Sequence, residues 1–550
     1  MKIKYLLFLL LFSFTLPSSA QKTKSGNPQN KLARPKLVVG IVVDQMRYDF
    51  LYRFYNRYES GGFKRLLNEG FSCENASIDY IPTYTAIGHS TVYTGSVPSI
   101  HGIAGNDFII QTTGKTLYCT ADSIVKTVGS TSAAGEMSPR NLLSTTVTDE
   151  LKMATNFRSK VIGIAMKDRG AILPAGHSAN AAYWFDDLTG NWISSTYYMN
   201  ALPNWVQTFN QSKRVEKYMK QDWNTLYPIS TYTQSYPDSN RYEGKFSNSA
   251  QGIFPIKTSA MLAKGFGGIR STPYGNSITL DLAKAAIENE ALGQNSDTDF
   301  LTVSFSSTDY IGHQLGHNSV EIEDTYLRLD HDLSSFFTFL DSKMGKGNYT
   351  VFLTSDHGAA TNANLLKDKN IPAGLWPGKE ILADLNSLLL SKYKAPGLVI
   401  GLGNYQVNLN NLLIAKNKLN EQEIVTDCIA FLKNKPGVAF VVNMQNIQNS
   451  SIPDELRSRI VNGYNAERSG AIQLILKPGW YLGYSSTGTT HGTWNSYDAH
   501  IPLLFMGWGI NKGKTNQAVR MTDIAPTVSA LLHIQEPNGS IGKPIVEVLK

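Results

Sequence analysis

The stretch that decides the fold is residues 308–317, which read TDYIGHQLGH. It follows residues 300–305, the apolar run FLTVSF, which has the composition of a buried strand. Asp309 and His313 are four positions apart, so a helical turn after the strand would place both side chains on one face. A carboxylate and an imidazole on one face can hold the same cation. We therefore expect this stretch to carry metal ligands at a strand end.

Other segments place the same kinds of side chain after apolar runs. Asp356 and His357 follow the run at 348–354, and Asp44 ends the run at 36–43. A further histidine stands in a Thr-His-Gly segment near the C-terminus. Open α/β sheets bind their ligands at the carboxyl edge of parallel strands, where such side chains would meet. Four such segments together predict a two-metal site at that edge.

The candidate ligands combine carboxylate oxygens with imidazole nitrogens and include no cysteine. This donor set suits catalytic zinc or manganese rather than a closed structural site. The plain alternative is that each Asp caps a helix and each His is a satisfied core residue. Because the residues share one pattern, we prefer the metal interpretation for Asp44, Asp309, Asp356, His313, His357 and His491.

The N-terminus has the layout of a secretory signal peptide. Residues 1–20 combine Lys2 and Lys4, an apolar run and a small-residue end at Ala20. The apolar run is too short for a membrane anchor, and no later stretch is apolar enough to span a bilayer. We therefore expect cleavage after Ala20, a flexible lead-in over 21–35, no membrane span after cleavage, and a periplasmic or secreted protein.

Composition restricts the possible partners. The chain has 550 residues, of which 17% are charged and 42% hydrophobic, as in a globular protein. Removing Lys2 and Lys4 lowers its formal charge from +7 to +5. No basic block is interleaved with aromatic residues, so nucleic-acid binding is not expected. The chain has three cysteines, Cys73, Cys119 and Cys428. This odd number leaves open either a Cys73–Cys119 disulfide or three free thiols.

The pattern of elements predicts a catalytic core interrupted by inserted segments. We assign the first part of the core to 36–358, with an aromatic, weakly periodic insertion at about 178–268. Residues 359–470 have enough helical and strand-like runs for an inserted α+β subdomain. The second part of the core is 471–550, in which residues 471–476 and 501–506 are expected to return to the main sheet.

Four further residues are candidates for binding a phosphate group. Thr85 begins an expected helix, where its hydroxyl is either an N-cap or a nucleophile at a site that favours phosphate. Asn106 is either a turn former or a donor to a phosphoryl oxygen. Lys167 and Arg169 follow an expected strand. They are either solvated charges at a corner of the chain or a cationic pair that binds a dianionic phosphoryl group.

The remaining histidines of interest receive no role in the predicted site. His317 continues the face that carries Asp309 and His313, and it is left outside the metal ligands. His89, His101 and His500 are interpreted as structural residues.

Two motifs make the chain resemble the alkaline phosphatase superfamily. They are Asp-x-x-Gly-His-x-x-Gly at 309–316 and Ser-Asp-His-Gly at 355–358. A threonine about forty residues after a strand-end aspartate, as Thr85 follows Asp44, is a third shared feature. Within the superfamily the chain is similar to phosphate-irrepressible (PafA-type) alkaline phosphatases over essentially the whole mature sequence.

The resemblance implies an α/β fold with an alkaline-phosphatase-like core: a mostly parallel sheet sandwiched by helices, with an inserted α+β subdomain. It also implies two Zn²⁺ per chain. One ion would be held by Asp309, His313 and His491, and the other by Asp44, Asp356, His357 and the Thr85 oxygen. Asn106, Lys167 and Arg169 match the family's phosphoryl-binding positions.

The expected activity is that of an exported, monomeric, zinc-dependent alkaline phosphatase. It would hydrolyse small-molecule phosphate monoesters through a phosphothreonine intermediate at Thr85. One alternative is a nucleotide pyrophosphatase/phosphodiesterase of the same superfamily. Another, from a different class, is an exported protein that binds metal or phosphate without catalysis.

Overall fold

Five parallel strands form the centre of the fold. In the computed structural model, which describes residues 32–246 and 252–550, these strands are adjacent members of one sheet. Every residue of the five is buried, as expected where helices cover both faces of a parallel sheet. In sheet order they are β11 (Tyr349–Thr354), β1 (Leu37–Val43), β10 (Asp299–Phe305), β7 (Val161–Ala165) and β8 (Ala181–Asp186). The predicted signal peptide and residues 21–31 of the predicted lead-in lie outside the described residues.

Further strands of at most five residues extend the sheet at both edges. Beside β11, β19 (Leu503–Gly507) runs antiparallel and is followed by β2 (Phe71–Cys73) and β20 (Gly513–Thr515). Beyond β8 come β9 (Asn191–Ser195) and β6 (Thr127–Val128), both in antiparallel pairs. In the described chain this gives a ten-stranded, mostly parallel sheet, and the predicted α/β class is confirmed.

Successive residues of each central strand pack into different cores because side chains alternate between the two faces of a sheet. Odd-numbered residues of β1 belong to the core that contains α10 (Tyr274–Asn289) and α12 (Val320–Met344). Val38 and Val42 belong to the core on the other face, with α3 (Thr85–Thr94) and α5 (Val147–Ala154). The sheet is therefore covered by helices on both faces.

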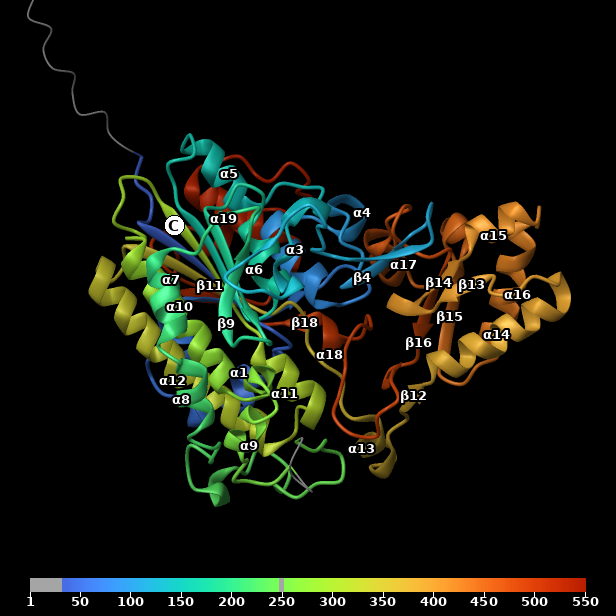
Figure 1. Cartoon of the computed structure of the whole chain (residues 1–550), viewed down its shortest axis with the longest axis horizontal. Helices are drawn as coiled ribbons and strands as arrows, with labels where there is room; N and C mark the ends of the chain where they lie inside the picture. The colour runs from blue at the N-terminus through green and yellow to red at the C-terminus, as the bar shows by residue number, and fades with distance from the viewer. Residues whose placement is uncertain (1–31, 247–251) are drawn as a thin grey trace, which may run out of the picture. The chain divides into compact units, whose positions relative to one another are not determined.

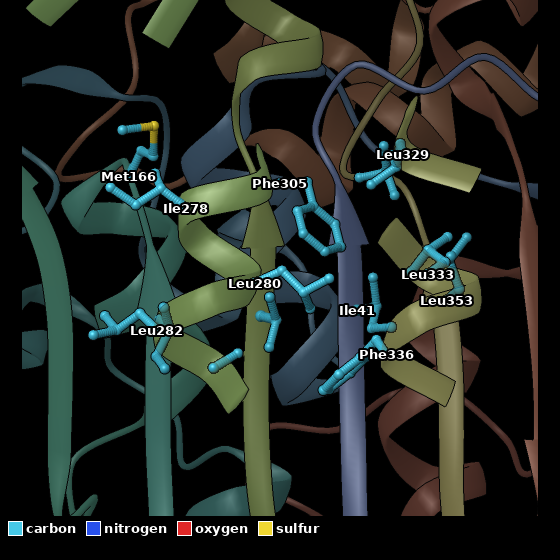
Figure 2. Close-up of a cluster of buried hydrophobic side chains, with 14 of the residues drawn as sticks. Ile41, Met166, Ile278, Leu280, Leu282, Phe305, Leu329, Leu333, Phe336 and Leu353 are labelled. Atoms are coloured by element: carbon cyan, nitrogen blue, oxygen red, sulfur yellow. The ribbon is translucent and has the colours of Figure 1, made fainter. Parts of the chain in front are cut away.

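Figure 2 shows the packing on the first face. Ile278 and Leu282 from α10 and Leu333 and Phe336 from α12 belong to one core with Ile41 of β1, and all five are at most 1% exposed. Burying each of these side chains contributes about 1.5–3 kcal/mol to the free energy that stabilises the folded state. This face holds the strands in register, and the register brings their carboxyl ends to a common level.

Residues 471–476 do not return to the main sheet, contrary to the expectation from sequence. They form β16 (Ile472–Leu476), which pairs antiparallel with β14 (Gln406–Leu409) and β15 (Val438–Asn443) in a separate four-stranded sheet completed by β13 (Val399–Gly401). This sheet and its helices, coloured orange in Figure 1, share their own core. A short apolar run reveals burial but not its pairing partner, which caused the error. The division of the chain into domains stays a prediction.

The aromatic region at 178–268 also begins differently from the prediction. Its first part supplies β8 and β9 of the main sheet, while α7 (Asn204–Gln211), α8 (Arg214–Met219) and α9 (Thr258–Leu262) follow. Tryptophans and tyrosines fill the buried positions of these strands, which hid the aliphatic pattern typical of a parallel strand.

The open question about the cysteines has a clear answer. Cys73, Cys119 and Cys428 are all buried, and all three are free thiols. Among the residues that the structure describes, no helix is both long enough and apolar enough to cross a membrane.

Candidate active site

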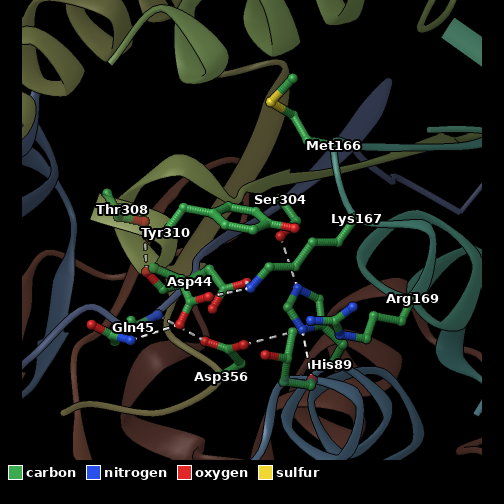
Figure 3. A network of polar contacts seen from close by, with 12 residues as sticks. Asp44, Gln45, His89, Met166, Lys167, Arg169, Ser304, Thr308, Tyr310 and Asp356 are labelled. Atoms are coloured by element: carbon green, nitrogen blue, oxygen red, sulfur yellow. Dashed lines mark hydrogen bonds and ion pairs between the residues drawn. The ribbon is translucent and has the colours of Figure 1, made fainter. Parts of the chain in front are cut away.

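The predicted ligands converge at the carboxyl ends of the three central strands. Asp44 follows β1, Asp356 and His357 follow β11, and α11 (Ser307–Leu315) begins directly after β10. Because the strands are parallel and in register, these ends lie side by side. Figure 3 shows Asp44 and Asp356 facing each other across this edge. The sheet edge therefore forms the floor of the site.

One group of ligands combines Asp309, His313 and His491. The α11 helix places His313 Nε2 3.1 Å from Asp309 Oδ1, and His491 Nε2 lies 3.7 Å from the same oxygen. His313 Nδ1 is bonded to the Thr489 carbonyl at 2.9 Å, and His491 Nδ1 to the Thr83 carbonyl at 2.7 Å. A carbonyl at Nδ1 fixes the tautomer that leaves the Nε2 lone pair available to a cation.

The second group combines Asp44, Asp356 and His357, all fully buried. His357 Nε2 lies 3.4 Å from Asp356 Oδ2 and 3.7 Å from Asp44 Oδ1. Neither of these two carboxylate oxygens accepts a hydrogen bond. A buried carboxylate oxygen without a donor is costly unless a cation binds it. This donor set therefore fits a metal ion.

The surroundings of Asp309 and His491 favour the protonation states that metal ligands need, whereas burial and the charges of Asp309 and Asp356 raise the pKa of Asp44 well above its usual range. Burial alone would raise the pKa of Asp309, but the positive charges of His313 and Lys167 lower it well below its usual range. Burial, followed by the charges of His357 and His313, lowers the pKa of His491 well below its usual range. An ionised carboxylate and a neutral imidazole are the forms that bind metal.

Thr85 is the first residue of α3, and its side chain is 1% exposed. Its Oγ1 lies 3.3 Å from His357 Nε2. Gly88 allows this approach, because a Cβ at that position would lie 2.4 Å from the Asp356 carbonyl oxygen. The helix N-terminus therefore meets the second ligand group, with the hydroxyl between them.

Asn106, Lys167 and Arg169 reach the same region from two other elements. Asn106 Oδ1 accepts a hydrogen bond from the Ala86 amide at 3.0 Å, so the side chain lies at the N-terminus of α3. Lys167 Nζ lies 2.6 Å from both Asp44 Oδ2 and Asp309 Oδ2, between the two ligand groups (Figure 3). Arg169 Nη1 donates to the Tyr118 hydroxyl at 3.0 Å, and its buried Nε has no partner.

Comparison with known proteins decides the family. A family model described as type I phosphodiesterase / nucleotide pyrophosphatase matches residues 38–498. A Myroides odoratus protein called calcium-transporting ATPase is 59% identical over 94% of this chain and 96% of its own length. Alkaline phosphatase PhoV of Synechococcus elongatus is 54% identical over 100% of both chains. The crystal structure of alkaline phosphatase PafA superposes with a TM-score of 0.93 at 51% identity, covering 95% of this chain and 100% of that one.

The chain belongs to the alkaline phosphatase superfamily. It is of the PafA type, as the motifs predicted, and its fold is the fold of those enzymes. The predicted enzyme class, a phosphoric monoester hydrolase, is confirmed by the same relatives.

Two residues that sequence reasoning missed support the ligands of this alkaline phosphatase fold. Gln45 adopts a left-handed backbone with φ of 64°, and its Nε2 donates to Asp309 Oδ1 at 2.6 Å. His89, which was assigned no role in the site, contacts the Thr85 carbonyl at 2.9 Å through Nδ1, and the same nitrogen lies 3.4 Å from Asp356 Oδ2. Its Nε2 contacts Ser304 Oγ at 2.8 Å. His89 is one helical turn after Thr85, and that spacing could have identified it.

His101, His317 and His500 lie outside both ligand groups. His317 Nε2 contacts Thr361 Oγ1 at 3.0 Å, although His317 is only one turn from His313. His101 is buried near Thr91, and His500 contacts the Glu74 carbonyl.

Proposed function

We propose that this protein is an exported, zinc-dependent alkaline phosphatase that hydrolyses phosphate monoesters through a phosphothreonine at Thr85. The observation that carries the proposal is the convergence of two three-residue ligand groups with a hydroxyl at a helix N-terminus. The amides and dipole of such an N-terminus favour a phosphate group next to that hydroxyl.

The reaction has two displacements at phosphorus. The Thr85 oxygen forms a bond to phosphorus while the bond to the ester oxygen breaks, and the released alcohol takes up a proton. Water then attacks the phosphothreonine, which frees inorganic phosphate and returns the proton to the Thr85 oxygen. Nucleophilic catalysis of this kind divides one difficult step into two easier ones.

Bound zinc would supply Lewis-acid chemistry, lowering the pKa of a coordinated oxygen and offsetting charge on the leaving oxygen. The residues proposed to hold one ion are Asp309, His313 and His491. The other ion would be held by Asp44, Asp356, His357 and the Thr85 oxygen. Mixed aspartate and histidine donors without cysteine are typical of catalytic zinc.

The formal charges of the site match a phosphate dianion. Three aspartates, Asp44, Asp309 and Asp356, are opposed by Lys167 and Arg169, which leaves one net negative charge. Two divalent ions would turn this into three positive charges. An ionised nucleophile and a dianionic phosphoryl group together supply three negative charges. A diester supplies one fewer, so the cationic pair favours monoesters.

Metal content tests the site. Chelation is expected to abolish turnover, zinc to restore it, and the active protein to contain two zinc ions per chain. His313→Ala should lower the content to about one ion per chain, because it removes one ligand of the first group only. Elemental analysis of the purified protein measures this directly.

His317→Ala is the matched control, since His317 lies one turn away and belongs to neither group. It should retain two ions. Full activity with less than one metal ion per chain would show that the two-metal proposal is wrong.

Export is tested independently of catalysis. The mature protein is expected in the periplasmic or secreted fraction with Gln21 as its first residue, because residues 1–20 have the signal-peptide pattern. Cell fractionation followed by N-terminal sequencing checks this. An active protein that retains Met1 and stays in the cytoplasm would refute the export proposal.

A further inference from the structure

The aromatic ring of Tyr310 lies close to two positively charged side chains. Tyr310 follows the candidate ligand Asp309 on α11 and is partly exposed. Lys167 Nζ lies 5.0 Å from the centroid of its ring, and the guanidinium carbon of Arg270 lies 5.6 Å from the same centroid. Figure 3 shows the ring beside the Lys167 side chain. Both distances are within the range in which an aromatic face attracts a cation.

The ammonium group of Lys167 keeps one N–H donor for a substrate. An ammonium has three such donors, and two of them go to Asp44 Oδ2 and Asp309 Oδ2, each at 2.6 Å. The imidazoles face the other oxygens of these carboxylates. His357 Nε2 is 3.7 Å from Asp44 Oδ1, and His313 Nε2 is 3.1 Å from Asp309 Oδ1. Lys167 therefore does not occupy the oxygens that face the histidines, and its third donor can reach a phosphoryl oxygen.

A lysine needs a rigid neighbour to direct that third donor. Its ammonium is a point charge on a flexible stem, without the fixed geometry of a guanidinium. Lys167 is only 2% exposed, so little water competes with the ring of Tyr310 for the ammonium. A cation–π contact is stronger when the cation is desolvated. The ring is therefore well placed to restrict where the ammonium lies.

Arg270 holds both Tyr310 and the backbone next to Lys167. Its Nη1 donates to the Met166 carbonyl at 2.9 Å and to the Tyr310 hydroxyl at 3.3 Å. Its Nη2 donates to the Phe185 carbonyl at 2.9 Å, near the end of β8. Met166 immediately precedes Lys167 in the chain. One planar guanidinium thus fixes the ring and the lysine relative to each other.

We propose that Tyr310 is a positioning residue for Lys167, which directs the ammonium at the phosphoryl group of the substrate. The inference rests on the proposed function, in which Lys167 binds a phosphoryl oxygen. A misplaced ammonium costs a dianionic monoester more than a diester, because the monoester presents more charge to it. The preference for monoesters should therefore depend on Tyr310 as well as on Lys167 and Arg169.

Two substitutions separate the ring of Tyr310 from its hydroxyl. In the zinc-loaded mature protein, Tyr310→Leu should lower kcat/KM for a monoester about 5- to 30-fold, the factor that a desolvated cation–π contact supplies. The value for a diester with the same leaving group should fall less than about threefold. Tyr310→Phe keeps the ring and should stay within about threefold of wild type on both substrates. Calorimetric titration with inorganic phosphate should show weaker binding in Tyr310→Leu and not in Tyr310→Phe.

A double-mutant cycle assigns the effect to the contact with Lys167. On the monoester, Tyr310→Leu combined with Lys167→Ala should be no slower than Lys167→Ala alone. In an Arg169→Ala background, Tyr310→Leu should still cost its full factor. Every variant should keep the zinc content of the wild type. If Tyr310→Leu loses zinc or does not fold, Tyr310→Met replaces it, because a flexible methionine fills the space without an aromatic face.

Phe431→Leu is the matched control for removing an aromatic ring from a lysine. Lys435 Nζ lies 4.0 Å from the centroid of the Phe431 ring, where no phosphate site is proposed. This variant should leave both activities unchanged. Unchanged monoester activity in Tyr310→Leu, equal losses on monoester and diester, or a full loss that persists when Lys167 is alanine would overturn the inference and leave the proposed role of Lys167 intact. If Lys167→Ala itself did not change the ratio of the two activities, the inference and the proposed phosphate contact would both be wrong.

Discussion

Thr85→Ala is expected to lower kcat/KM for a phosphate monoester by roughly 10⁴–10⁶-fold, the scale seen when an enzyme loses its nucleophile. The Thr85 hydroxyl is buried at the N-terminus of α3 and lies 3.3 Å from His357 Nε2. Alanine keeps the helix but removes the only atom proposed to attack phosphorus. Thr85→Ser keeps that oxygen and should retain activity within about tenfold.

The control for this prediction is Thr94→Ala. Thr94 is also buried, at the opposite end of α3 from Thr85, and its hydroxyl donates to the Ser90 carbonyl at 2.8 Å. Its loss should cost about 1 kcal/mol of stability and leave kcat unchanged. If Thr85→Ala kept wild-type activity and its full zinc content, Thr85 would be only a helix-capping residue and not the nucleophile.

Replacing both Lys167 and Arg169 by alanine should reduce the preference of the enzyme for phosphate monoesters over phosphate diesters. Each charge-assisted contact to a phosphoryl oxygen is worth about 1.5–3 kcal/mol, or roughly one to two decades in rate. The double variant should therefore lose about two to four decades in kcat/KM for a monoester. It should lose far less for a diester, which presents less charge to the pair. Steady-state kinetics with a monoester and a diester of the same leaving group measures both.

Lys152→Ala is the control for removing a buried ammonium group. Lys152 Nζ contacts the Ser159 carbonyl at 2.9 Å and Asn180 Oδ1 at 3.0 Å, and no phosphate site is proposed there. Its loss should affect stability and not the ratio of the two activities. Equal losses of both activities in the double variant, together with lost zinc, would mean that Lys167 only balances Asp44 and Asp309. The phosphodiesterase alternative would then gain support.

The central sheet and the convergence of the candidate ligands were predictable for the same physical reason. Parallel strands buried on both faces read as continuous apolar runs, and their carboxyl ends must lie together at one edge. The candidate ligands Asp44, Asp309 and Asp356 follow the ends of such runs closely, so their meeting point could be inferred from the sequence. Asp309 and His313 share a face because α11 is helical, as their spacing predicted.

The sequence-based predictions that failed or missed a residue depended on contacts and backbone turns that a local sequence pattern does not reveal. The run at 472–476 is buried, but nothing in its residues distinguishes the small sheet from the large one. Gln45 is a ligand-supporting residue only because its backbone turns left-handed after β1. The role of His89 depends on α3 packing against the end of β11, a contact between segments far apart in the chain.

The central claim is that phosphate passes through Thr85, and trapping this intermediate tests it most directly. The enzyme is mixed with a fast-reacting monoester, quenched in acid within the first turnovers, digested and examined by mass spectrometry. We predict one phosphoryl group on the peptide that contains Thr85, located at that residue by fragmentation. The Thr85→Ala protein treated identically should carry none. Phosphate on another residue, or burst kinetics with no phosphorylated peptide at all, would contradict the account.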